Sequence, residues 1–267
     1  MSGSRAEALR AAVLRLSGAG VGDPVGDARR LLRAAAGLDA AALSARLGEA
    51  MTAPEAARFE ASLARRAARE PVSHILGRRA FWGRSFRVTA DVLDPRPETE
   101  TLVAAALEGG AAGRILDLGV GSGCILLTLL AEWPSAEGIG VDASEAALSV
   151  ARENAAALGV AERALLLRGD WLDGVAGRAD LVVSNPPYLA TAEMAEIAPE
   201  LRREPAAALD GGPDGLAAYR RIAAGAGRAL ARGGRLLLEI APGREAAVSA
   251  LLGEAGFETP QLWRDLD

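Results

Sequence analysis

Short apolar runs alternate with longer segments of helical periodicity from Arg114 onward, and this alternation limits the fold more than any other feature of the sequence. A chain built this way forms a mostly parallel sheet with helices on both faces. The predicted strands are residues 114–118, 136–141, 164–168, 181–184 and 234–240, and the predicted helices are residues 123–132, 144–158, 215–231 and 242–255. The pattern therefore predicts an α/β fold that binds ligands beside the carboxyl ends of its strands.

The residues before this region follow another pattern. Through about residue 70, apolar positions recur at helical spacing, and this periodicity predicts a bundle of four or five short helices. Asp39 and Thr52 are the predicted N-caps of two of these helices, and Glu55 completes a capping box with Thr52. Two short strands on either side of Gly83 then predict a β-hairpin. Pro97 suits the first turn of a helix that follows the hairpin.

A glycine-rich turn follows the first strand of the α/β region. Glycine lets the backbone turn tightly and approach a ligand, and the free N–H groups of the next helix favour an anionic group. The predicted cofactor-binding residues here are Asp117, Gly119, Val120, Gly121, Ser122 and Gly123. From the residues alone, the turn fits a dinucleotide site, a purely structural turn or an S-adenosylmethionine (SAM) site. The spacing GxGxG, instead of GxGxxG, disfavours the dinucleotide site.

Two further strands end in residues that suit a nucleoside. Asp142 follows the second strand about 20 residues past the glycines, where a carboxylate can accept hydrogen bonds from both ribose hydroxyls. The alternative role for Asp142 is to cap the next helix, a role that Ser144 fills better. Asp170 and Trp171 end the third strand, and they predict an acceptor for the adenine amino group and a flat surface for the ring. A core position is the alternative for Trp171.

The fourth strand ends in the sequence Asn185-Pro-Pro-Tyr188. The prolines fix φ and remove N–H donors, so the loop presents the Asn185 side-chain oxygen and the Pro186 carbonyl as acceptors. These two acceptors can hold both hydrogens of a planar NH₂ group, and Pro187 and Tyr188 can lie against it. We therefore predict substrate binding at residues 185–188, with Asn185, Pro186 and Tyr188 as the catalytic residues and Asn185 also beside the cofactor. A rigid turn is the alternative.

Composition excludes several kinds of chemistry. The 30 basic residues are all arginines, so there is no lysine nucleophile or P-loop lysine. One Cys and one His exclude an intrachain disulfide and a zinc cluster. They also exclude a Cys/His or Ser/His/Asp catalytic unit that needs a spare histidine. The net charge of −5 and the absence of a signal-peptide or membrane-span pattern predict a cytoplasmic protein without a membrane or a direct nucleic-acid partner. The first 100 residues are net basic, which indicates either ordinary solvated faces or a docking surface for an acidic partner.

The order of these motifs resembles that of class I SAM-dependent methyltransferases that act on nitrogen. Several further motifs resemble those of the HemK/PrmC family, whose members methylate the glutamine of the GGQ motif in peptide-chain release factors. These motifs are Pro71-Val-Ser-His-Ile-Leu-Gly77, Phe81-Trp-Gly83, Pro95-Arg-Pro-Glu-Thr-Glu100, Asn185-Pro-Pro-Tyr188, Arg203-Glu-Pro205 and Leu209-Asp-Gly-Gly212. The resemblance covers nearly the whole chain.

This resemblance implies a Rossmann-like methyltransferase domain with SAM as cofactor, S-adenosylhomocysteine as product, no metal, release factors as partners and a monomeric state. The implied domains are a helical substrate-recognition domain at 1–75, a β-hairpin linker at 76–96 and the methyltransferase domain at 97–267. The chain departs from the family at Ala80, at the segment Glu239-Ile-Ala-Pro-Gly-Arg244, and in lacking one more strand after Trp263.

Three other functions stay open at this level. An N-methyltransferase acting on adenine or guanine in nucleic acid could use the same loop, but the α/β region is acidic and lacks a basic, aromatic-rich segment. A glutamine methyltransferase acting on a ribosomal protein is a closer alternative, which the segment 95–100 disfavours. A non-enzymatic interaction module would leave the Asn185 loop without a role.

Overall fold

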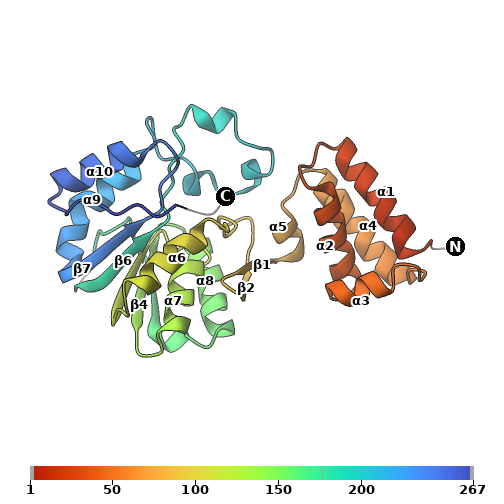
Figure 1. The fold of residues 1–267 in the computed structure, drawn as a ribbon, viewed down its shortest axis with the longest axis horizontal. Coiled ribbons are helices and arrows are strands. Elements are labelled where there is room, and N and C mark those ends of the chain that lie inside the picture. The colour runs from red at the N-terminus through yellow and green to blue at the C-terminus, as the bar shows by residue number, and fades with distance from the viewer. Residues whose placement is uncertain (1–2, 176, 265–267) are drawn as a thin grey trace. The chain divides into compact units, whose positions relative to one another are not determined.

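The computed structural model describes residues 3–175 and 177–264, and its chain forms two compact units (Figure 1). The helical unit contains the residues up to Gly77 together with Pro199–Arg203. The sheet unit contains Arg78–Ala198 and the residues from Glu204 onward. Among the described residues, no helix is both long and apolar enough to cross a membrane.

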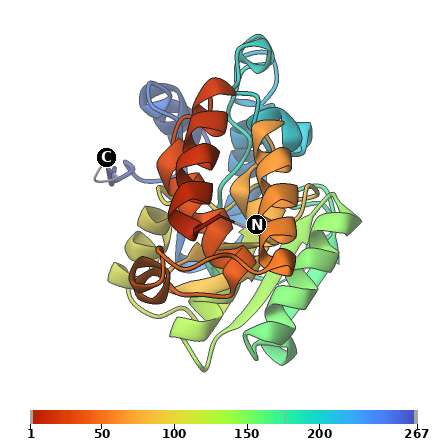
Figure 2. The same ribbon diagram turned by 90° about the vertical axis from the view of Figure 1, so that its right-hand side faces the viewer.

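The helical unit has five α-helices among its described residues, and the longer ones pack side by side (Figure 2). They are α1 (Arg5–Gly18), α2 (Pro24–Ala36), α3 (Ala40–Ala45), α4 (Ala53–Ala67) and α5 (Val72–Leu76). The predicted caps are confirmed: Asp39 accepts a hydrogen bond from the N–H of Ala42, and Thr52 forms a capping box with Glu55. Leucines from α1 and α2 and Phe59 from α4 fill the core of the unit.

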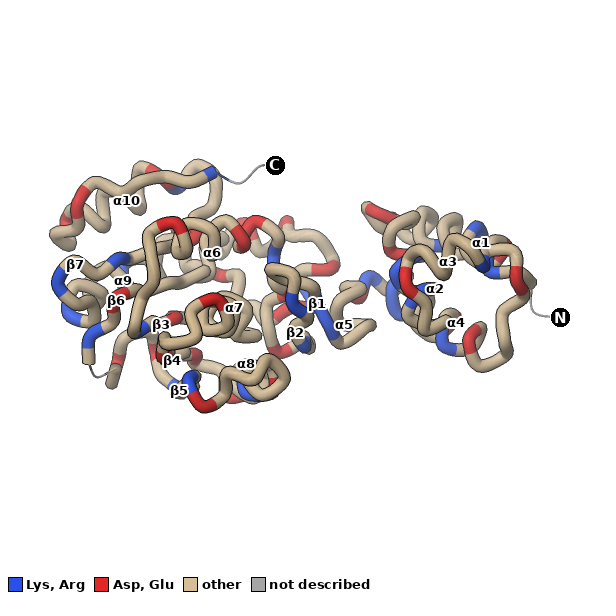
Figure 3. Tube along the Cα trace, turned by 60° about the horizontal axis from the view of Figure 1, so that its bottom comes forward, with Lys and Arg blue, Asp and Glu red and all other residues tan. Residues whose placement is uncertain are grey.

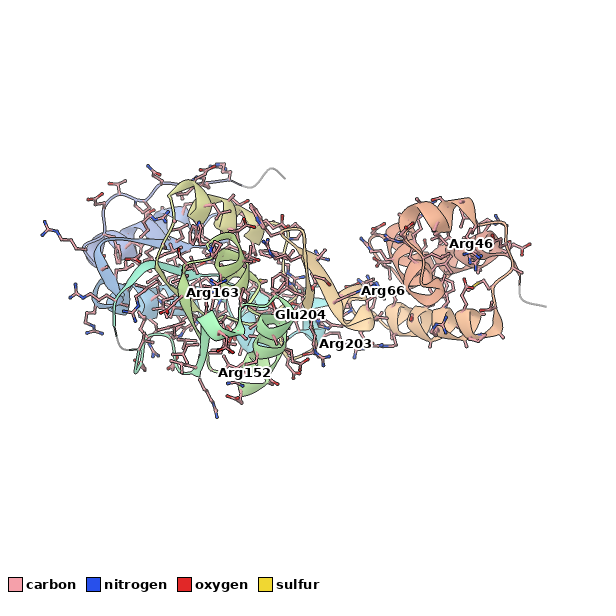
Figure 4. All side chains as sticks on the ribbon, turned by 90° about the horizontal axis from the view of Figure 1, so that it is seen from below. Arg46, Arg66, Arg152, Arg163, Arg203 and Glu204 are labelled. Carbon is pink, nitrogen blue, oxygen red and sulfur yellow. The ribbon has the colours of Figure 1, made fainter. Side chains whose placement is uncertain are left out.

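Buried ion pairs join distant parts of the helical unit. Arg66, labelled in Figure 4, contacts Asp27 at 2.6 Å and Glu200 at 2.8 Å, and Arg69 also contacts Glu200. These bonds attach the segment 199–203 to the helices. Acidic and basic residues are interspersed over this unit (Figure 3), so many of its arginines are already paired with acids.

The predicted hairpin is present and packs into the core of the sheet unit. It consists of β1 (Arg78–Phe81) and β2 (Arg84–Arg87), joined by a tight turn at Trp82 and Gly83, both with positive φ. A two-residue turn with positive φ matches the twist of paired strands. Phe81 and Phe86 are buried with their rings edge to face and their centroids 6.0 Å apart.

The main sheet confirms the predicted α/β fold. Its strands are β3 (Arg114–Leu118), β4 (Glu137–Asp142), β5 (Ala164–Arg168), β6 (Ala179–Ser184) and β7 (Leu230–Leu238). They lie in the order β5-β4-β3-β6-β7, and all neighbouring pairs are parallel. From the centre of the sheet, β3, β4 and β5 follow one another in one direction, and β6 and β7 follow in the other. The strand order therefore reverses between β3 and β6, and α/β sheets bind ligands beside such a reversal.

Helices cover both faces of this sheet (Figure 1). One face packs against α6 (Thr99–Glu108), α7 (Cys124–Glu132) and α8 (Glu145–Ala157) through an apolar cluster that includes buried leucines of α7. The other face packs against α9 (Ala217–Ala229), and α10 (Glu245–Glu254) contacts α9. Short 3₁₀ turns lie at Ala161–Arg163, Glu193–Ala195, Leu201–Arg203 and Ala206–Ala208.

Most predicted boundaries differ from the structure by one to three residues, and two differences have a clear physical reason. Helix α6 begins at Thr99, so Pro97 precedes the helix instead of lying in its first turn. Strand β7 begins at Leu230, four residues before the predicted start, because Leu230 already pairs with Ala179 ahead of an irregularity in the ladder. Regular pairing resumes at Arg235, opposite Leu181.

Candidate functional site

Four residues that end or directly follow strands lie in one row along the carboxyl edge of the sheet. Leu118 pairs with Val141, Asp117 pairs with Val183, and Ser184 pairs with Leu238. Continuing these registers by one position for the first and third pairs and by two for the second makes Asp142, Gly119, Asn185 and Glu239 neighbours in one row. Three of these residues belong to the predicted site. The register of the sheet brings together residues that are far apart in the sequence.

The glycine turn has the backbone that its sequence predicts. Gly119, Gly121 and Gly123 all have positive φ, at 74°, 52° and 82°, a region that side chains with a Cβ disfavour. The N–H groups of Gly119 and Val120 donate to the carbonyl of Val141, at 2.8 and 3.0 Å. Gly123 then caps the start of α7. The turn thus joins β3 to a helix whose first N–H groups lie beside the strand ends.

Asp117 is buried beneath this turn, with 1% of its surface exposed. Its Oδ2 accepts a hydrogen bond from the N–H of Leu126 at 3.2 Å, whereas Oδ1 has no partner. Burial raises the pKa of Asp117 to about 7, against the lowering effect of the Leu126 hydrogen bond and with a smaller contribution from the nearby charge of Asp142. An unpaired buried carboxyl oxygen is costly, and a cationic ligand group would compensate it.

Asp142 holds the glycine turn in addition to its predicted role. Its Oδ2 accepts from the N–H of Gly121 and its Oδ1 from the N–H of Ser144, both at 2.9 Å. Ser144 caps α8, as expected. Each Asp142 oxygen keeps acceptor capacity for a ribose hydroxyl. Ribose binding by Asp142 stays a prediction.

The structure adds an unpredicted partner to the proposed adenine site. Asp170 is 59% exposed and forms an ion pair with Arg221 of α9 at 2.9 Å. Trp171 has φ of 54° and is half buried, with its ring packed against the apolar cluster under α9. A Cβ on Gly119 would lie 3.9 Å from that ring. Trp171 therefore combines a core position with a place beside the glycine turn.

Asn185 has an oriented side chain at the end of β6. Its Nδ2 donates to the hydroxyl of Thr99, the first residue of α6, at 3.1 Å. Its Oδ1 is buried and has no hydrogen-bond partner. Among the described residues, nothing donates a hydrogen bond to the Pro186 carbonyl. Both acceptors predicted for a planar NH₂ are therefore free, next to Tyr188, whose pKa is raised by burial.

Arg96, Thr99 and Glu100 of the segment 95–100 each contact another motif. Arg96 contacts both oxygens of Glu204, which is labelled in Figure 4, at 2.7 Å, and Thr99 holds Asn185 as described. Glu100 accepts a hydrogen bond from the N–H of Trp82 at 2.7 Å. This one segment thus connects the hairpin, the Asn185 loop and the segment that begins at Glu204.

A glycine-rich segment supports the Asn185 loop from behind. The N–H of Gly211 donates to the carbonyl of Leu189 at 2.7 Å, and the N–H of Leu189 donates to the carbonyl of Leu209 at 3.0 Å. A Cβ on Gly211 would lie 2.7 Å from the carbonyl oxygen of Pro187. A Cβ on Gly215, where φ is 72°, would collide with the carbonyl oxygen of Tyr188. Only glycine permits this backbone contact.

Thr99, Arg221 and Glu239 were not predicted as site residues. Glu239 is largely buried next to Asn185; burial raises its pKa, and hydrogen bonding to Thr99 and Asn185 opposes that effect. The sequence carries only a partial signal for Glu239, an acidic residue near the end of an apolar predicted strand, because the predicted strand 234–240 included Glu239 whereas β7 ends at Leu238. Arg221 lies on a helix face that carries no comparable signal.

Comparison of the sequence with known proteins identifies the family of this chain. Residues 7–77 match the model of the PrmC N-terminal domain, and residues 97–216 match the methyltransferase small domain. The chain is 56% identical to the release factor glutamine methyltransferase of Cereibacter sphaeroides, over 98% of this chain and 94% of that protein. The chain belongs to the release factor glutamine methyltransferase family.

Two other comparisons extend this assignment. The family member from Caulobacter vibrioides is 48% identical, over 97% of this chain and 92% of that protein. The solved structure of a methyltransferase from Pyrococcus furiosus superposes with a TM-score of 0.54 at 16% identity, covering 70% of this chain and 86% of that one. The last similarity concerns the fold alone, and it agrees with the methyltransferase architecture predicted from the family motifs.

Proposed function

We propose that this protein transfers a methyl group from SAM to the side-chain amide nitrogen of the glutamine in the GGQ motif of peptide-chain release factors. The observation that carries the proposal is the unpaired, buried Oδ1 of Asn185, held in place through Nδ2 and adjacent to the free carbonyl of Pro186. The names of the relatives at 56% and 48% identity support the same substrate.

The residues at the strand ends fit SAM. The unpaired Oδ1 of Asp117 suits a cationic amino group, and the positive φ of the glycines allows the backbone to lie against a ligand. The residues that would hold the cofactor are Asp117, Gly119, Val120, Gly121, Ser122, Gly123, Asp142, Asp170, Trp171 and Asn185. When bound, SAM supplies an electrophilic methyl group on a sulfonium, and S-adenosylhomocysteine is the product.

Residues of the loop 185–188 would bind the substrate amide. Asn185 Oδ1 and the Pro186 carbonyl accept its two N–H bonds, and Pro187 and Tyr188 lie against its plane. An amide nitrogen is a weak nucleophile, so orientation of its lone pair supplies much of the rate. Positive charge develops on this nitrogen as it reacts, and two fixed acceptors stabilise that charge. The proton leaves afterwards to water or to a loop carbonyl.

Labelled SAM tests the substrate class directly. The protein would be incubated separately with a release factor, a release factor whose GGQ glutamine is replaced by alanine, a ribosomal protein and DNA. We expect label only in the unmodified release factor. Equal label in the alanine variant, or transfer to DNA or ribosomal protein alone, would contradict the proposal.

We also propose that the protein acts as a monomer and in the cytoplasm.

The ionisation of Asp117 predicts a pH-dependent affinity for SAM. With a pKa of about 7, the carboxyl is protonated below that pH and must lose its proton to attract a cation. The affinity is therefore expected to rise between about pH 5.5 and 7, by up to about tenfold per unit, and then to level off. Calorimetric titration at several pH values measures this. Asp117→Asn should bind more weakly with a flat profile, and a flat profile in the wild type would contradict the prediction.

Loss of the Asp142 carboxylate is expected to weaken SAM binding by about 1–3 kcal/mol. The reason is twofold: the ribose loses its acceptor, and the N–H groups of Gly121 and Ser144 lose theirs. Asp142→Ala would be compared with Asp170→Ala, whose exposed carboxylate should contribute less because water replaces it. Equal calorimetric affinities of Asp142→Ala and the wild type would refute the ribose assignment.

We also propose that residues 1–75 recognise the release factor away from the GGQ loop. Arg10 and Arg29 are exposed on α1 and α2. Replacing both by glutamate should raise KM for an intact release factor and leave KM for a short GGQ peptide unchanged, because the peptide lacks the second contact. The control with equal charge is Arg152→Glu combined with Arg228→Glu on the sheet unit. An equal rise in KM with both substrates would contradict docking by this unit.

A further inference from the structure

The side chain of Glu239 lies on the same face of the sheet as that of Asn185. Val183 in β6 and Leu237 in β7 pack in the apolar cluster that also contains residues of α6. Side chains alternate along a strand, so residues two positions further on face the same way. Asn185 and Glu239 are those residues, in register with each other, and both face the helix that begins at Thr99.

The backbone of Glu239 is held from two directions. Its N–H donates to the carbonyl of Ser184 at 3.0 Å, directly before Asn185. Its carbonyl accepts from the hydroxyl of Tyr219 in α9 at 2.9 Å. The carboxylate lies next to the Thr99–Asn185 hydrogen bond, and the influence of both side chains lowers its pKa against the effect of burial. Its Oε2 is buried and has no partner, like the Oδ1 of Asn185.

When Glu239 is ionised, these contacts favour one orientation of the Asn185 amide. An ionised carboxylate only accepts hydrogen bonds, so the groups that face Glu239 must donate. The Thr99 hydroxyl then donates to Glu239 and keeps a lone pair for Nδ2 of Asn185. A reversed amide would place Oδ1 against the carboxylate and turn an NH₂ toward the substrate NH₂, where two donors cannot pair.

We propose that Glu239 is a positioning residue that, with Thr99, turns the Asn185 nitrogen inward and leaves Oδ1 free to accept from the substrate amide. This inference rests on the proposed function. Glu239 acts on the reaction through Asn185 and contacts neither the substrate nor the transferred methyl group.

Single-turnover methylation of a release factor tests the role, with SAM affinity measured in parallel. Glu239→Gln keeps the shape but offers both a donor and an acceptor, so both amide orientations become possible. We expect its rate to fall by about 10- to 100-fold, the cost typical of losing a residue that orients the ligands of a metal site, with the Kd for SAM unchanged within about twofold. The rate of Thr99→Val should also fall, and the rate of Thr99→Ser should stay near that of the wild type because serine keeps the hydroxyl.

A double-mutant cycle separates positioning from a structural role. In an Asn185→Ala background, Glu239→Gln should lower the rate no further, because its effect passes through Asn185. Tyr219→Phe removes the hydrogen bond to the Glu239 backbone without changing its carboxylate; it should lower the melting temperature and reduce the rate less than Glu239→Gln does. If Glu239→Gln fails to fold, Thr99→Val against Thr99→Ser decides the question.

Two results would overturn the proposal. One is a wild-type rate for Glu239→Gln. The other is an equal loss of rate from Glu239→Gln in the wild-type and in the Asn185→Ala backgrounds. Failure of the proposed function gives a different result, since the wild-type protein itself would then leave the release factor unmethylated.

Discussion

Replacing Asn185 by alanine is expected to reduce kcat for release-factor methylation by about 10²- to 10³-fold, the range found when one preorganised polar group is removed from a transition state. The variant loses the buried acceptor Oδ1, while Thr99 and the backbone of the loop remain. The substrate amide would keep only the Pro186 carbonyl. Its nitrogen would then be poorly oriented, and the charge that develops on it would lack half of its stabilisation.

Single-turnover methylation measures this effect without interference from product release. SAM affinity, measured by calorimetry on the same preparation, is the control, and we expect it to change far less because Asp117 and Asp142 lie on other strands. A rate near that of the wild type would mean that the loop is only a rigid turn. A matched loss of SAM affinity would mean that Asn185 serves the cofactor instead of the substrate.

Removal of the Arg96 side chain is expected to lower the free energy of unfolding by about 3 kcal/mol, the lower end of the range for breaking a buried ion pair. The lower end applies because Arg96 is 27% exposed, although its partner Glu204 is only 1% exposed. Arg96→Met would leave the Glu204 carboxylate buried with a single remaining donor, the N–H of Asp94 at 3.2 Å. Urea denaturation measures the change.

The double variant Arg96→Met with Glu204→Leu provides the control. Because the buried charge is then removed together with its partner, stability should recover much of the loss. An unfolding free energy for Arg96→Met within about 0.5 kcal/mol of the wild type would show that water already solvates Glu204 and that the ion pair contributes little.

Local features of the fold could be predicted from the sequence because they depend on neighbouring residues. The two residues of the capping box, Thr52 and Glu55, are three positions apart, and the apolar run that forms β3 was predicted with the boundaries observed. The start of β7 could not be predicted. It depends on Leu230 pairing with Ala179 across an irregular ladder, a contact between strands that no local pattern encodes.

The candidate site shows the same division. The Asn185 loop and the glycine turn have recognisable compositions, so their acceptors and donors could be inferred from the amino-acid sequence. The partners that orient them are distant: Thr99 lies 86 residues from Asn185, and Arg221 lies 51 residues from Asp170. Such contacts arise only when the sheet register places strand ends side by side, so sequence reasoning missed Thr99, Arg221 and Glu239.

The most direct test of the account is to locate the methyl group. Release factor incubated with the protein and SAM would be digested, and the peptide that contains the GGQ motif would be sequenced by tandem mass spectrometry. We expect the added mass of one methyl group on the glutamine side chain, and its near absence when Asn185→Ala is assayed for the same time. A methyl group on any other residue, or an unmodified glutamine under conditions in which SAM is bound, would contradict the account.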